Sequence, residues 1–176
     1  MARCSARARD QPGRIRGPIL ELLAGVLRCV VEGREAEGRQ LALLVEERCL
    51  KIKEHAAAAG KRLPEVLAAI RAKVMGRLAE ISANPDSDRL EQEMVYLAQK
   101  LDIAEELDRL ATHTDEVLKI VRQNQPIGRR LEFLLQELNR EANTLGAKSA
   151  DIETTRASVE IKVLIEQMRE QIQNIE

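Results

Sequence analysis

Apolar residues recur at helical spacing along almost the whole sequence, and this periodicity constrains the fold more than any other feature. No segment shows the strict alternation of apolar and polar residues that is typical of a strand. Tyr96 and Phe133 are the only aromatic residues, so aliphatic side chains must fill the interior, which favours helix–helix seams. We therefore expect an all-α chain built from long antiparallel helical hairpins, in the manner of a coiled-coil bundle. Between residues 19 and 59 the series runs Leu20, Leu23, Leu27, Val30, Val31, Leu41, Leu44, Val45 and Ile52.

Glycine, proline and capping residues divide this pattern into segments. Gly60 and Gly146 are expected to end helices as residues just past the last turn. Asp86 or Asp88 is expected to cap the helix that follows the loop 82–88, and Pro126 is expected to break the chain before the next helix. The helices predicted from these signals span residues 19–59, 63–81, 88–124, 129–145 and 151–174.

The domain organisation predicted from composition has three parts. Residues 1–17 carry five arginines and one aspartate without hydrophobic periodicity, so we expect a disordered, Arg-rich segment. A long helical arm is predicted over residues 18–81, with Pro18 in its first turn. A C-terminal helical domain is predicted over residues 82–176.

Charge and cysteine content exclude several classes of protein. The formal net charge is −1 although 32% of the residues are charged, so any nucleic-acid contact must come from local patches. Cys4, Cys29 and Cys49 are odd in number and lack metal-ligand spacing, which indicates free thiols and a reducing, cytoplasmic location. No run of 18 apolar residues exists, so we expect no membrane span.

The segment 131–148, LEFLLQELNREANTLGAK, has an unusual polar face. Its leucines form one packing stripe, but the remaining positions carry amides and carboxylates rather than loosely patterned Lys and Glu. Glu137 and Glu141 lie four residues apart along one border of the stripe, so their carboxylates can converge on one cation. Asparagine is a weak helix former, so its presence on this face indicates a task other than helix stability.

A second polar stripe lies in DIAEELDRLATH, residues 102–113. Asp102, Glu106, Arg109 and His113 follow the spacing i, i+4, i+7 and i+11 beside an apolar arc. Carboxylates hold hard cations such as Mg²⁺ or Mn²⁺, His can bind Mn²⁺ or move a proton, and Arg neutralises phosphate. The stripe is therefore a candidate metal site with a phosphate clamp.

Both polar faces also have an ordinary structural explanation. Charged residues four apart on a helix usually form solvated pairs worth about 0.2–0.5 kcal/mol, and a histidine beside an apolar arc is usually a half-buried surface residue. The sequence has no Gly-rich phosphate loop, no HExxH motif and no nucleophile motif. Pattern alone thus predicts a helical protein with two unusual polar faces.

Three segments resemble the YicC/YloC family of bacterial stress-induced proteins. They are RLEQEMVYLAQKLDIAEELDRLATH at residues 89–113, GRRLEFLLQELNREANTLGAKS at 128–149, and EIKVLIEQMREQIQNIE at 160–176. A weaker similarity, REAEGRQLALLVEER at residues 34–48, extends the match to about residues 20–176. The resemblance implies a metal-dependent endoribonuclease that cuts RNA and assembles as a homo-oligomeric hexamer.

The resemblance also implies roles for individual residues. In the two motifs DIAEELDRLATH and NREANT, it implies that Glu106, His113 and Glu141 are catalytic. The candidate ligands of a divalent metal, Mn²⁺ or Mg²⁺, are Asp102, Glu105, Glu106, His113, Glu137 and Glu141, and the choice among the carboxylates rests on their chemistry rather than on the resemblance. The implied RNA-binding residues are Arg109, Arg129, Arg130, Arg140, Asn143 and Lys148.

One departure from the family leaves an alternative open. Family members carry a separate domain before the helical half, and the Arg-rich segment 1–17 stands in its place here, so we expect a C-terminal helical part without that domain. The alternative to a nuclease is a non-catalytic helical scaffold, or an RNA-binding or oligomerisation protein, which would assemble without metal or RNA.

Overall fold

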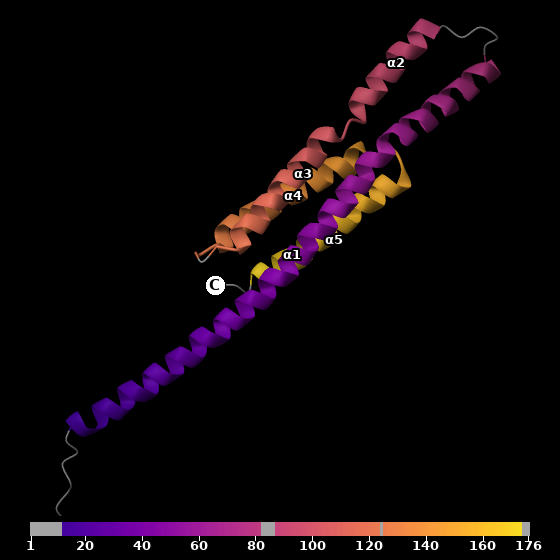
Figure 1. Ribbon diagram of the computed structural model, residues 1–176. Helices are drawn as coiled ribbons and strands as arrows, with labels where there is room; N and C mark the ends of the chain where they lie inside the picture. Colours follow the sequence, from indigo (N-terminus) through magenta and orange to yellow (C-terminus); the bar gives the residue numbers. More distant parts are fainter. Residues whose placement is uncertain (1–11, 82–86, 124, 174–176) are drawn as a thin grey trace, which may run out of the picture. The chain divides into compact units, whose positions relative to one another are not determined.

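The computed structural model describes residues 12–81, 87–123 and 125–173 (Figure 1). Within these ranges the chain is helical and contains no strand, which confirms the all-α prediction. Coiled-coil packing remains a prediction. The helices are α1 (Pro12–Ile81), α2 (Ser87–Lys100), α3 (Ala104–Val121), α4 (Gly128–Lys148) and α5 (Ile152–Ile172).

The chain divides into two compact units, residues 1–40 and residues 41–176. The described part of the first unit belongs to helix α1, and eight of its large apolar side chains are between 51% and 70% exposed. They are Ile19, Leu20, Leu22, Leu23, Val26, Leu27, Val30 and Val31, named here the α1 apolar face. Nowhere in the described ranges is a helix long and apolar enough to cross a membrane.

The second unit is built around one aliphatic core. Helix α4 packs against both α3 and α5, and α1 adds buried residues from its turns between residues 45 and 59. The Cys49 thiol is fully buried, and this burial raises its pKa to about 12. The largest fully enclosed side chains are Ile52, Leu110, Ile120, Leu131, Leu135, Leu138, Leu145, Ile161, Ile165 and Met168.

Contacts across this core show that neighbouring helices run antiparallel. Between α1 and α5, the Sγ of Cys49 lies 3.9 Å from the Sδ of Met168, and farther along α1 the Nε of Arg62 lies 3.0 Å from an oxygen of Asp151. Between α3 and α4, His113 lies near Glu141 whereas the earlier residue Glu106 reaches the later residue Lys148. The predicted antiparallel arrangement is therefore present among these helices.

Two glycines predicted to end helices lie inside them instead. Helix α1 continues through Gly60 to residue 81, and α4 continues through Gly146 to residue 148. Neither has a positive φ. A Cβ at Gly60 would lie 3.0 Å from the Cδ1 of Leu107, and a Cβ at Gly146 would lie 2.6 Å from the Oγ of Ser158. Glycine is therefore used at both positions for close approach of a neighbouring helix, not for a left-handed cap.

The helix predicted from residue 88 to about 124 is divided. Helix α2 ends at Lys100 and α3 begins at Ala104. The Oδ1 of Asp102 accepts a hydrogen bond of 2.9 Å from the backbone N–H of Ala104, which is how a short acidic side chain starts a helix. Ile103 inserts into the core at this break, where it is 2% exposed.

The N-terminal prediction is corrected in part. Residues 1–11 of the predicted disordered segment lie outside the described residues. Helix α1 begins at Pro12, so the backbone of residues 12–17 is helical and the predicted start at Pro18 is wrong. Proline at the first helical position has no N–H to leave unpaired, and this makes Pro12 a favourable start.

Candidate metal centre

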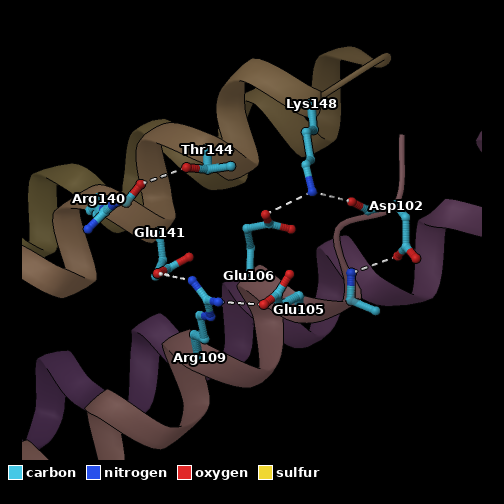
Figure 2. A network of polar contacts seen from close by, with 9 residues as sticks. Asp102, Glu105, Glu106, Arg109, Arg140, Glu141, Thr144 and Lys148 are labelled. Carbon is cyan, nitrogen blue, oxygen red and sulfur yellow. Dashed lines mark hydrogen bonds and ion pairs between the residues drawn. The ribbon is translucent and has the colours of Figure 1, made fainter. Parts of the chain in front are cut away.

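The polar residues of interest lie along the seam between α3 and α4. Each helix turns an apolar stripe into the core, with Leu110 and Val117 buried on α3 and Leu138 and Ala142 buried on α4. Residues three or four positions away from those stripes fall at their borders. Because the helices run antiparallel, the border residues of α3 and α4 face one another in reverse order (Figure 2).

His113, Glu137 and Glu141 come together at one point on this seam. One potential ligand atom from each residue lies within 4.8 Å of the other two. Glu141 is only 4% exposed, and the other two side chains are half-buried. The two glutamates are the pair whose spacing predicted convergence, and His113 joins them from the opposite helix. We name this group the His–Glu–Glu site.

The chemistry of these three donors fits a small divalent cation. Two carboxylates and one imidazole are donors that Mn²⁺ accepts, and carboxylate oxygens suit Mg²⁺. Opposite ligands of an octahedral ion at about 2.1 Å are roughly 4.2 Å apart, so the observed spacing of up to 4.8 Å requires only small side-chain rotations. The remaining positions of such an ion would face water or a substrate.

Arg109 lies beside this site and pairs with two carboxylates (Figure 2). Its Nη1 donates to the Oε1 of Glu141 over 3.3 Å, and its Nη2 donates to the Oε1 of Glu105. The hydrogen bond with Glu141 and the charges of both carboxylates raise the pKa of Arg109. The guanidinium therefore stays positively charged beside the His–Glu–Glu site.

Glu106 and Lys148 form a second, separate ion pair on the same seam. Glu106 is 6% exposed, and its Oε1 lies 2.8 Å from the Nζ of Lys148. The same Nζ donates to the backbone oxygen of Asp102 over 2.8 Å. The Oε2 of Glu106 is buried without a hydrogen-bond partner in the described part of the chain. One ion pair and one hydrogen bond thus hold the Lys148 ammonium between α3 and the turn before it.

The six predicted ligands are therefore divided by the structure. His113, Glu137 and Glu141 gather, whereas Glu105 faces Arg109 and Glu106 faces Lys148. The Asp102 carboxylate is exposed and is engaged at the start of α3.

The predicted RNA-binding residues are also spread out. Arg109 and Lys148 are paired on the seam, and the exposed side chains of Arg140 and Asn143 lie on the outer part of α4. Arg130 pairs with Glu116 at the opposite end of α4.

Arg129 also lies at that end, in the wall of a cavity of about 780 Å³ that includes Arg169 of α5. Sequence reasoning missed Arg169, because its place in the apolar repeat of the last helix gave no sign that it lies near Arg129.

The fold and the site together define a helical-bundle protein with a candidate divalent-cation centre on one interhelical seam. The chain belongs to the YicC-like endoribonuclease family: the family model described as "Endoribonuclease YicC-like, C-terminal" matches residues 59–176. The predicted family is thereby confirmed.

Two curated relatives are similar to most of this chain. The "Probable endoribonuclease YicC" of Haemophilus influenzae is 45% identical over 143 residues, which cover 81% of this chain and 50% of that protein. The protein of the same name from Clostridioides difficile is 40% identical over 148 residues, which cover 82% of this chain and 50% of that protein. The chain thus spans about half the length of the curated relatives that it matches.

Proposed function

We propose that this chain is the helical part of a metal-dependent endoribonuclease that hydrolyses RNA phosphodiester bonds. Two supports carry the proposal. The relatives are named probable endoribonucleases, and His113, Glu137 and Glu141 place three donor atoms within 4.8 Å of one another beside a charged arginine. Of these, the convergence of the donors is the observation that carries the proposed chemistry.

In this proposal the residues of the seam divide the chemical work. His113, Glu137 and Glu141 hold Mn²⁺ or Mg²⁺. A bound ion supplies Lewis-acid polarisation of a phosphoryl oxygen and lowers the pKa of a coordinated water. A carboxylate oxygen of the site that is not bound to the ion would accept the proton of the attacking water, whereas the His113 imidazole could do so only if it did not bind the ion. Arg109 neutralises the charge that develops on the phosphate.

The experiment is cleavage of a labelled structured RNA by the purified chain, with Mn²⁺ and with EDTA. We expect cleavage only with Mn²⁺ and a loss of more than about tenfold in the Glu141→Gln variant. Glu132→Gln serves as the matched control, because it makes the same change at an exposed position of the same helix. A folded wild-type chain that does not cut RNA in Mn²⁺ would contradict the proposal for this chain.

A second candidate function is a non-catalytic scaffold that assembles with itself, and the α1 apolar face favours it. Eight large apolar residues, each more than half exposed, lie within one stretch of 13 residues of α1. Self-association by itself is compatible with the proposed nuclease, and we propose that the chain forms a homo-oligomer, as the resemblance to hexameric family members implies. The free thiols Cys29 and Cys49 support a cytoplasmic location for such an assembly.

A further inference from the structure

Glu141 is a buried carboxylate whose countercharge comes from the surface. Its side chain is 5% exposed, whereas that of Arg109 is 54% exposed, and the hydrogen bond between them is 3.3 Å long. A buried carboxylate without a positive partner is strongly destabilising. In the cation-free chain Arg109 is therefore the positive partner found for Glu141 in the described part of the seam.

A divalent cation in the His–Glu–Glu site would replace that countercharge. Glu137 and Glu141 together carry two negative charges and a neutral His113 carries none, so one divalent cation balances the site without Arg109. The guanidinium and the ion would then be like charges beside the same carboxylate, and they would repel each other. Arg109 and the ion thus compete for Glu141.

The surroundings of Arg109 leave it free to move, in contrast to the other cation on the seam. Lys148 is held by a buried carboxylate and by the backbone oxygen of Asp102. The hydrogen bonds found for Arg109 go to the buried Glu141 and to Glu105, whose side chain is 68% exposed. Release from Glu141 would leave Arg109 beside the surface carboxylate of Glu105, with which it is already paired (Figure 2).

We propose that Arg109 is an exchangeable counter-ion: it neutralises Glu141 when the site holds no cation, and it turns to a phosphate of RNA when a divalent cation takes its place. The planar guanidinium suits this second role because it can donate two parallel hydrogen bonds to one phosphate. The inference rests on the proposed function. It adds that binding of the ion and binding of the phosphate are positively coupled through one side chain.

The test is Mn²⁺ binding to the full chain, measured by titration calorimetry for the wild type and for Arg109→Gln. Removing the competing charge should strengthen Mn²⁺ binding by about fivefold or more. The same variant should bind a non-cleavable, 2′-O-methyl RNA more weakly than the wild type when Mn²⁺ is present. Arg156→Gln removes an equal charge from an exposed position on α5, and it should change neither affinity.

A second measurement guards against poor folding of the variant. Arg109→Gln leaves Glu141 without its countercharge, so its melting temperature in EDTA should fall below that of the wild type. Addition of Mn²⁺ should then raise the melting temperature of the variant by more than that of the wild type, because the ion binds the folded state more tightly.

Different outcomes test the His–Glu–Glu site and the counter-ion role of Arg109. A wild-type chain that binds no Mn²⁺, or that binds it as well after Glu141→Gln, would overturn the His–Glu–Glu site and the counter-ion inference with it. A wild type that binds Mn²⁺ at Glu141, with an Arg109→Gln variant that binds it equally or more weakly, would overturn the inference about Arg109 alone.

Discussion

At the scale of single residues, the ion pair of Glu106 and Lys148 carries a clear stability prediction. Lys148→Met keeps much of the apolar stem but leaves the Glu106 carboxylate, only 8% exposed, without its cation. We expect the free energy of unfolding to fall by about 1–3 kcal/mol, because a buried charge loses its partner. The expected loss is smaller than for a fully buried ion pair, because the side chain of Lys148 is 32% exposed. Urea denaturation measures the change.

The matched control removes the negative charge of Glu106 that the Lys148→Met variant leaves without a partner. Glu106→Gln in the Lys148→Met background should restore part of the lost stability, because a neutral amide costs less to bury than a carboxylate. The double-mutant cycle then gives a coupling energy well above zero. Purely additive losses from the two substitutions would show that the ion pair contributes nothing to folding.

Asp151 predicts a stability change that depends on pH. Burial opposes ionisation of this carboxylate, but hydrogen bonds from Thr154 and Arg62 outweigh burial and hold the pKa of Asp151 below its ordinary value of 3.8. The ionised Asp151 carboxylate therefore stabilises the fold fully above the pKa that it has in the unfolded chain. This stabilisation is lost as the pH falls through the lower pKa of Asp151 in the folded chain. Asp151→Asn should cost about 0.5–1 kcal/mol at pH 7, and the difference from wild type should shrink below about pH 4.

Urea denaturation at several pH values between 3 and 7 tests this prediction. Asp108→Asn is the control, because Asp108 is an exposed residue of α3, and its effect should be small at every pH. A difference between wild type and Asp151→Asn that is as large at pH 3 as at pH 7 would mean that the charge of Asp151 does not stabilise the fold.

The candidate site shows which residue-level features a sequence can reveal. Glu137 and Glu141 share one helix, so their spacing alone predicted that they converge. Asp102 shares the helical spacing of the polar stripe at residues 102–113, but α3 begins only at Ala104, so Asp102 lies outside that helix. The position of His113 opposite the glutamates depends on the antiparallel register of α3 and α4. That register follows from packing across the whole core, which no local pattern specifies.

At the scale of elements, Gly146 marks a close approach of α4 and α5. An added Cβ would lie 2.6 Å from the Oγ of Ser158, and that hydroxyl already donates to the backbone oxygen of Ala142 over 3.0 Å. Gly146→Ala should therefore lower the free energy of unfolding by about 1–3 kcal/mol, although alanine is the better helix former. Thermal or urea unfolding measures the loss.

Two further substitutions separate this clash from other effects of the methyl group. Gly76→Ala lies on α1 where a Cβ would meet nothing within 4 Å, so it should stabilise the chain by up to about 1 kcal/mol. Ser158→Ala combined with Gly146→Ala removes the hydroxyl that the new methyl group meets, and it should recover stability relative to Gly146→Ala alone. A Gly146→Ala variant that is more stable than the wild type would show that α4 and α5 do not pack closely at this position.

The two glycines also explain why helix boundaries were harder to predict than helices. A glycine after an apolar repeat is read as a cap when only the local sequence is known. At Gly60 and Gly146 the reason for glycine is a side chain from another helix, Leu107 in one case and Ser158 in the other. The apolar period fixed which segments are helical, whereas the ends and breaks depended on tertiary contacts.

At the scale of the whole molecule, the two compact units differ in where their apolar residues lie. The second unit encloses one cluster of aliphatic side chains among α1, α3, α4 and α5. The described part of the first unit leaves the eight residues of the α1 apolar face more than half exposed. Contiguous apolar surface on a protein usually marks an interaction site. A second copy of this chain is the proposed partner, because a net charge of −1 gives little repulsion between copies.

Charge introduced on the α1 apolar face tests this self-association. Leu23→Glu with Leu27→Glu places two carboxylates in the middle of the face, and burying them against another copy would be costly. We expect the wild-type chain to sediment as an oligomer and the double variant as a smaller species, with helical content retained because glutamate is a good helix former. Arg28→Glu changes the net charge by the same two units from outside the apolar arc, so it should leave the sedimentation coefficient of the wild type unchanged. Equal sedimentation of all three chains would show that this face is not the site of assembly. The exposed apolar residues of the second unit, such as Tyr96 on α2 and Phe133 on α4, would then be the next candidates for the interface.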